Sequence, residues 1–114
     1  MEERIEYLPL GSIVLLKGGL QKLMIISRAV NVQNNDMIYF FDYAAVAYPD
    51  GLISDQLAYF NMEMISRVVF RGYSDIDDDN AVDNINMYIK DHPEIIKGSA
   101  EDWVYEEEED EDDE

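Results

Sequence analysis

Residues 8–73 repeat one pattern, in which short apolar runs alternate with turn-forming residues. Residues 13–16 (IVLL) are followed by Lys17-Gly18-Gly19, and a second apolar run at 23–26 continues beyond that turn. Runs of this length that are bounded by glycine, proline and asparagine are typical of β-strands and are too short for a helix of three turns. The pattern therefore predicts a mainly β structure, which begins with an antiparallel hairpin.

The same signals predict three more strands. Residues 34–36 tolerate positive φ, and a long strand is expected over 37–48 with a kink at Ala44-Ala45. The turn Pro49-Asp50-Gly51 then leads into a short strand at Leu52-Ile53, and residues 66–70 form the last strand.

Residues 60–65 are expected to form a single helical turn, with Asn61 as its N-cap. Five strands with one helical turn before the last predict a small SH3-like barrel or a strongly bent antiparallel sheet.

A helix is predicted after this sheet. Asp77, Asp78 and Asp79 complement the dipole of a helix start, and the apolar pattern ends before His92-Pro93. The chain is thus divided into a β domain at 1–74, a helical segment at 75–100 that packs on it or binds a partner, and an acidic tail at 101–114.

Charge is unevenly distributed. The chain has 26 acidic and 8 basic residues, and residues 101–114 hold 11 of the acidic and none of the basic ones. Positions 106–114 are all Glu or Asp and are expected to be disordered, while Trp103, Val104 and Tyr105 could dock on the domain. The net charge of −18 argues against nucleic-acid partners and anionic membranes.

The N-terminus has no apolar signal region, and no apolar run is long enough to span a membrane, so we expect a cytoplasmic protein.

Catalytic and metal sites find little support in the sequence. There is no cysteine, and His92 is the single histidine, placed as a capping or surface residue. Asp75, Asp77 and Asp79 have the spacing of a calcium loop, but Asn80 and Asn86 replace its required glycine and glutamate. No nucleotide or hydrolase motif is present, so we expect no enzyme activity, no metal and no cofactor.

Aromatic residues offer the best candidate for a site. Eight tyrosines exceed what a small core needs, and tyrosine is favoured in protein interfaces. The alternation of faces along residues 37–48 places Ile38, Phe40 and Asp42 on one side and Tyr39, Phe41 and Tyr43 on the other. We therefore predict a partner-binding surface made by Phe41, Tyr43, Tyr48 and Tyr59, with Tyr39 nearby, or else a second small core beneath the helix.

Two groups of motifs resemble a small Gram-positive family that shares a domain of unknown function. The first group is Leu8-Pro9-Leu10-Gly11-Ser12, Val14, Leu16-Lys17-Gly18-Gly19, Lys22-Leu23-Met24-Ile25-Ile26 and Arg28. The second is Asp42-Tyr43, Tyr48-Pro49-Asp50-Gly51, Phe60-Asn61, Ile65, Val68-Val69-Phe70 and Gly72-Tyr73. Members of that family occur near genes for type VII secretion and for LXG-type polymorphic toxins. The resemblance implies a cytoplasmic chaperone or targeting factor that binds such a toxin, or a second adaptor, before export.

Two other functions remain open at this point. An immunity protein could mask the active site of a toxin, with its charge imitating nucleic acid, although a mimic should carry carboxylates on a rigid surface rather than in a tail. A structural subunit could instead assemble through the edges of its sheet.

Overall fold

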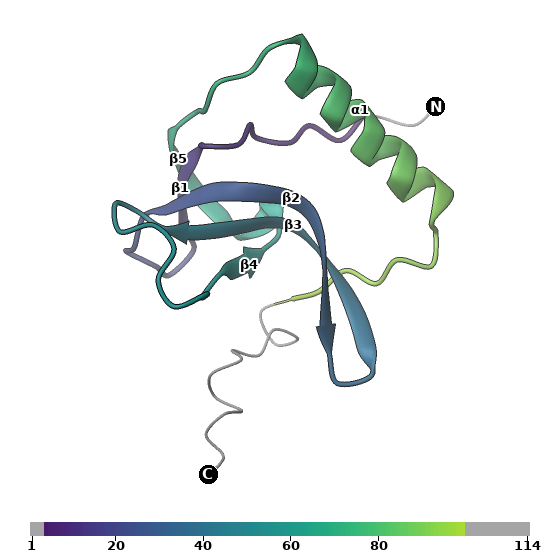
Figure 1. Cartoon of the computed structure of the whole chain (residues 1–114), viewed down its shortest axis with the longest axis horizontal. Coiled ribbons are helices and arrows are strands. Elements are labelled where there is room, and N and C mark those ends of the chain that lie inside the picture. Colours follow the sequence, from purple (N-terminus) through teal and green to yellow (C-terminus); the bar gives the residue numbers. More distant parts are fainter. Residues whose placement is uncertain (1–3, 100–114) are drawn as a thin grey trace.

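Five antiparallel strands, one 3₁₀ turn and one α-helix make up the computed structural model, which describes residues 4–99 (Figure 1). In chain order they are β1 Ile13–Leu16, β2 Leu23–Asn34, β3 Met37–Ala47, β4 Ala58–Phe60, η1 Met62–Met64, β5 Ile65–Phe70 and α1 Ile76–Asp91. The predicted mainly β fold with one C-terminal helix is confirmed. The predicted disordered tail at 101–114 lies outside the described residues.

The strand order β4-β3-β2-β1-β5 requires a strongly bent sheet. β4 and β5 lie at opposite edges, yet only residues 61–64 connect them, and three of these form η1. In a flat five-stranded sheet the two edge strands would lie four strand spacings apart, about 19 Å. Four residues that include a 3₁₀ turn span a much shorter distance. The two edges therefore curve toward each other. Within residues 4–99 no ladder joins β4 to β5, so the sheet is bent and open rather than a closed barrel.

β2 and β3 form a long hairpin that bends away from the rest of the sheet (Figure 1). Asn35 adopts the positive φ expected in the turn, at 61°. One extra residue, Ile26 of β2, interrupts the register opposite Ala44 and Ala45, the position at which a kink was predicted in the partner strand. The outer part of this hairpin, residues 31–39, extends past β4 and is called the hairpin arm below.

The loop after β3 differs from the prediction. Gly51 has a φ of +83° and its N–H donates to the Ala47 carbonyl at 2.7 Å, as expected for a turn. Leu52 and Ile53, however, do not form a strand, because Ser54 and Asp55 take positive φ values and turn the chain back so that Ile53 bridges only Gln56. The next strand begins at Ala58.

The core is centred on β3. Its buried cluster consists of Tyr7, Val14, Ile25, Tyr43, Ala45, Phe60 and Val82. β3 is buried continuously from Phe40 to Val46, so both of its faces are covered in this stretch. The predicted alternation of side chains between the two sides of this strand therefore does not separate buried from exposed residues here.

α1 packs on the sheet through the N-terminal segment, which runs between helix and strands (Figure 1). Asp75 caps the helix by accepting the Asp78 N–H at 3.2 Å. The helix ends before His92, as predicted. The Asn86 side chain accepts the Ile5 N–H at 2.7 Å and donates to the Ile5 carbonyl at 3.0 Å. Within the described part of the chain, no helix has the length and apolar character needed to cross a bilayer.

Candidate functional site

The four aromatic residues predicted to bind a partner do not form one surface. Phe41 and Tyr43 are each 1% exposed, Tyr59 is half-buried, and Tyr48 is exposed. The Tyr43 hydroxyl accepts the Leu8 N–H at 2.9 Å, and its ring packs on Phe60. Phe41 and Tyr43 are thus buried in the interior, with Tyr43 in the main core cluster.

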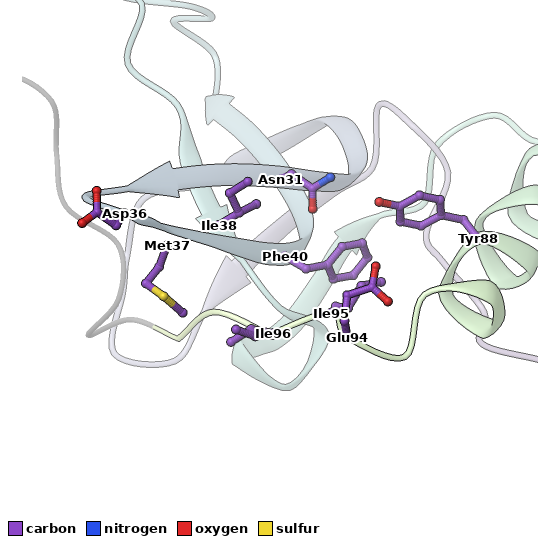
Figure 2. Close-up of a pocket in the computed structure, with 9 residues that line it drawn as sticks. All are labelled: Asn31, Asp36, Met37, Ile38, Phe40, Tyr88, Glu94, Ile95 and Ile96. Carbon is purple, nitrogen blue, oxygen red and sulfur yellow. The ribbon is translucent and has the colours of Figure 1, made fainter.

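An apolar cavity of about 380 Å³ lies between the hairpin arm and the segment that follows α1 (Figure 2). Met37 points from the arm toward the side on which Ile96 lies, Ile38 points from the arm in the opposite direction, and Tyr88 reaches in from the helix. Ile38 is 57% exposed and Ile96 44% exposed. The full lining is Asn31, Asp36, Met37, Ile38, Phe40, Tyr88, Glu94, Ile95 and Ile96.

A second cavity of about 480 Å³ adjoins the first, because Phe40 and Ile95 line both. It is formed by the N-terminal segment, η1 and the end of α1. Its lining is Ile5, Tyr7, Phe40, Asp42, Met62, Glu63, Ile89, His92, Pro93, Ile95 and Lys97. The two cavities together form one apolar groove with acidic residues at its rim, which is called the groove below.

Residues 92–98, here called the strap, form one wall of the groove and are attached to the edge of β3 beyond β4. The Phe40 N–H donates to the Ile96 carbonyl at 2.8 Å, and the Gly98 N–H donates to the Phe40 carbonyl at 2.8 Å. Asn61, only 2% exposed, accepts the Asp42 N–H at 2.9 Å and donates to the Gly98 carbonyl at 2.6 Å. The side chain predicted to cap η1 instead joins β3 to the strap.

Asp42 lies at the inner end of the groove, and its carboxylate is almost fully used by the fold. The side chain is 3% exposed and accepts the Met62 N–H at 2.9 Å and the Tyr7 hydroxyl at 3.4 Å. Lys97, whose side chain is half exposed, adds an ion pair at 3.2 Å. Since these contacts occupy both oxygens, Asp42 is placed to hold the strap and η1 against β3.

Two aspartates of the failed calcium motif have other partners. Asp75 caps α1, and Asp79 pairs with Arg4 at 3.3 Å. Among residues 4–99 no group of three His, Asp or Glu side chains is arranged to hold a metal ion.

Burial of two tyrosines is expected to make the fold less stable at alkaline pH. Burial, with a smaller effect from Asp42, raises the pKa of Tyr7, and burial also raises the pKa of Tyr43. Above the ordinary tyrosine pKa of about 10 the unfolded chain loses protons that the folded chain keeps, so stability must fall as the pH rises. We expect urea unfolding to show this loss above about pH 10, with a shallower slope in Tyr7→Phe. A Tyr7→Phe slope equal to that of the wild type would contradict the assignment.

Sequence reasoning missed the groove, although one signal was present. Met37 and Ile38 directly follow the turn at Asn35–Asp36, at the end of a long hairpin that no other strand of residues 4–99 covers. Apolar residues in such a place are exposed unless another segment reaches them. The sequence carries no comparable signal for the strap, because the strap forms no strand of its own. Among the described residues it pairs with a strand through a single bridge to Phe40.

The chain thus has the form of a small, open, strongly bent antiparallel sheet with a helix packed over its N-terminal segment and an apolar groove beside it. It belongs to the family of the domain of unknown function DUF4176, whose profile matches residues 7–81. No curated protein and no solved structure matches the chain. The match includes all five strands and the start of α1, and it ends before the strap.

Proposed function

We propose that this protein is a non-enzymatic, cytoplasmic accessory factor that binds an LXG-type toxin as a chaperone or targeting adaptor before export by type VII secretion. The observation that carries the proposal is the apolar groove between the hairpin arm and the strap, which exposes Met37, Ile38 and Ile96. The role in secretion rests on the resemblance of the sequence to a family that occurs near such toxin genes.

The shape and charge of the groove favour a helical partner segment. Proteins bind amphipathic helices by accepting apolar side chains in a groove, and the wall here is made of isoleucine, methionine and phenylalanine side chains. Asp36, Glu63 and Glu94 lie at the rim, which suits a helix whose apolar face is flanked by basic residues. A helical N-terminal region of a toxin would supply such a segment.

Catalysis has no comparable support in the groove. Asp42 is the buried carboxylate there, and its oxygens already bind Met62, Tyr7 and Lys97. His92 bonds through Nδ1 to the Tyr88 carbonyl at 2.8 Å and stacks on the Tyr88 ring. A general acid or base needs a free, tuned group next to a substrate, and both of these side chains are engaged by the fold.

Affinity purification of the tagged protein from its native cell, with mass spectrometry of the co-purifying proteins, tests the proposal. A toxin recovered through its helical N-terminal region, in near-stoichiometric amount, is the expected result. Recovery of a toxin's C-terminal catalytic domain alone would replace the proposal with an immunity function. Absence of any toxin from cells that express one would contradict both.

A single charge in the groove should weaken this binding. Ile38→Asp places a carboxylate on the exposed wall of the hairpin arm, and we expect the affinity for the toxin to fall by about ten-fold or more. Leu20→Asp introduces the same charge at a site that is 95% exposed, in the turn between β1 and β2, and should bind like the wild type. Titration calorimetry measures both variants. Equal binding by Ile38→Asp and wild type would exclude the groove as the site.

A further inference from the structure

The outer edge of β5 is an open, apolar edge of the sheet. β5 pairs with β1 on one side, and within residues 4–99 no strand pairs with its other side. Every residue from Ser66 to Phe70 is exposed, including Val68 at 45% and Phe70 at 57%. Two register shifts break the regular ladder with β1. Such an edge associates with other chains unless something covers it, and the shifts favour contact through side chains over a full extra strand.

Basic residues lie in and next to β5, in a chain whose net charge is −18. Arg67 lies within the strand and Arg71 directly follows it, while Lys17 follows the neighbouring strand β1, where its N–H donates to the Met64 carbonyl at 2.8 Å. Within the described residues none of the three forms an ion pair, whereas the other arginines and Lys97 do. The edge of β5 therefore combines apolar and basic side chains.

The described chain ends close to the start of β5. Ser99 lines a small apolar hollow of about 100 Å³ with Leu16 and Met64, and also with Phe41, Tyr59, Phe60 and Asn61. Leu16 pairs with Ile65, the first residue of β5, and Met64 precedes it. Trp103 is four residues beyond Ser99, a reach of up to about 14 Å, and β5 itself is about 20 Å long. Residues 101–105 can therefore reach β5 without any rearrangement of the sheet.

We propose that the chain's own C-terminal segment, residues 101–114, docks along the outer edge of β5. Trp103, Val104 and Tyr105 supply the apolar side chains that cover Val68 and Phe70. The 11 carboxylates of this segment, which contains no basic residue, neutralise the basic side chains of the edge. No regular structure is needed in the acidic run, because its charge acts over the distance of a Debye length. This docking surface is separate from the groove and does not depend on the function proposed for it.

The single tryptophan, Trp103, reports on this docking directly. In the native full-length chain at low salt, we expect its fluorescence emission to lie at shorter wavelength than in the urea-unfolded chain. Acrylamide should also quench it less in the native chain. Raising the salt concentration to about 1 M should move both signals toward the unfolded values, because screening weakens the attraction of the acidic run.

Charge reversal identifies the edge. Arg67→Glu should move the emission of Trp103 to the unfolded wavelength, while Lys90→Glu, the same change on the exposed end of α1, should leave it at the wild-type value. Far-UV circular dichroism checks that both variants are folded. Native emission equal to that of the unfolded chain would overturn the proposal. So would a blue-shifted emission that neither salt nor Arg67→Glu changes, or one that disappears on dilution as dimers dissociate.

Discussion

Replacing Gly72 with alanine is expected to destabilise the fold by about 3 kcal/mol or more, through overpacking against rigid backbone. A Cβ at this position would overlap the Leu10 carbonyl oxygen and lie 2.9 Å from the Ser12 nitrogen. Both atoms belong to the backbone where the chain enters β1, so no side chain can rotate away to make room. The same displacement would break the hydrogen bond from the Gly72 N–H to the Ser12 hydroxyl, 2.9 Å long.

Gly19→Ala is the matched control. A Cβ there would meet only the Leu16 carbonyl oxygen at 3.5 Å, an ordinary contact, and Gly19 does not have a positive φ. Substitution at such a position is expected to leave stability unchanged or to raise it by up to about 1 kcal/mol. Urea unfolding followed by circular dichroism compares the two variants. A Gly72→Ala variant as stable as Gly19→Ala would mean that residues 10–12 do not pack against residue 72 as described.

Removing the carboxylate of Asp42 is expected to cost about 2–4 kcal/mol, since it leaves buried partners without an acceptor. In Asp42→Ala the Met62 N–H and the Tyr7 hydroxyl lose their acceptor, and Lys97 loses its ion pair. For a domain of this size the melting temperature should fall by about 10 °C or more. The loss should be concentrated where β3, η1 and the strap meet.

Asp91→Ala provides the comparison, because it removes the same charge from an exposed position at the end of α1. Its unfolding free energy should change by no more than about 0.5 kcal/mol. Differential scanning calorimetry measures both variants. If the two melt within a few degrees of each other, the contacts of Asp42 contribute nothing net to stability.

The strands could be predicted because local chemistry marks their ends. Asn35 tolerates the φ of its turn, Gly51 reverses the chain after β3, and α1 ends before His92-Pro93. Each of these residues acts within a few positions of itself, so the sequence alone carries the information. The strand predicted at Leu52-Ile53 was wrong, because the two residues that follow, Ser54 and Asp55, take positive φ values although neither is glycine.

The groove could not be predicted in the same way, because long-range contacts form it. The strap reaches Phe40 across more than 50 positions in the chain and is fastened by Asp42 and Asn61, whose polar side chains gave no sign of burial. Phe41 and Tyr43 are buried because other segments cover both faces of β3. Alternation along one strand cannot reveal a second covering layer.

The placement of the N-terminal segment between α1 and the sheet links the two ends of the described chain. The Ile5 backbone hydrogen-bonds to the Asn86 side chain, and Arg4 pairs with Asp83, so the helix is held by residues that are synthesised well before it. These residues leave the ribosome some 80 positions before their partners. Residues 4 and 5 therefore lack these partners until α1 has been synthesised. A change that stiffens residues 4 and 5 would act on the helix that they hold, although the two are far apart in the sequence.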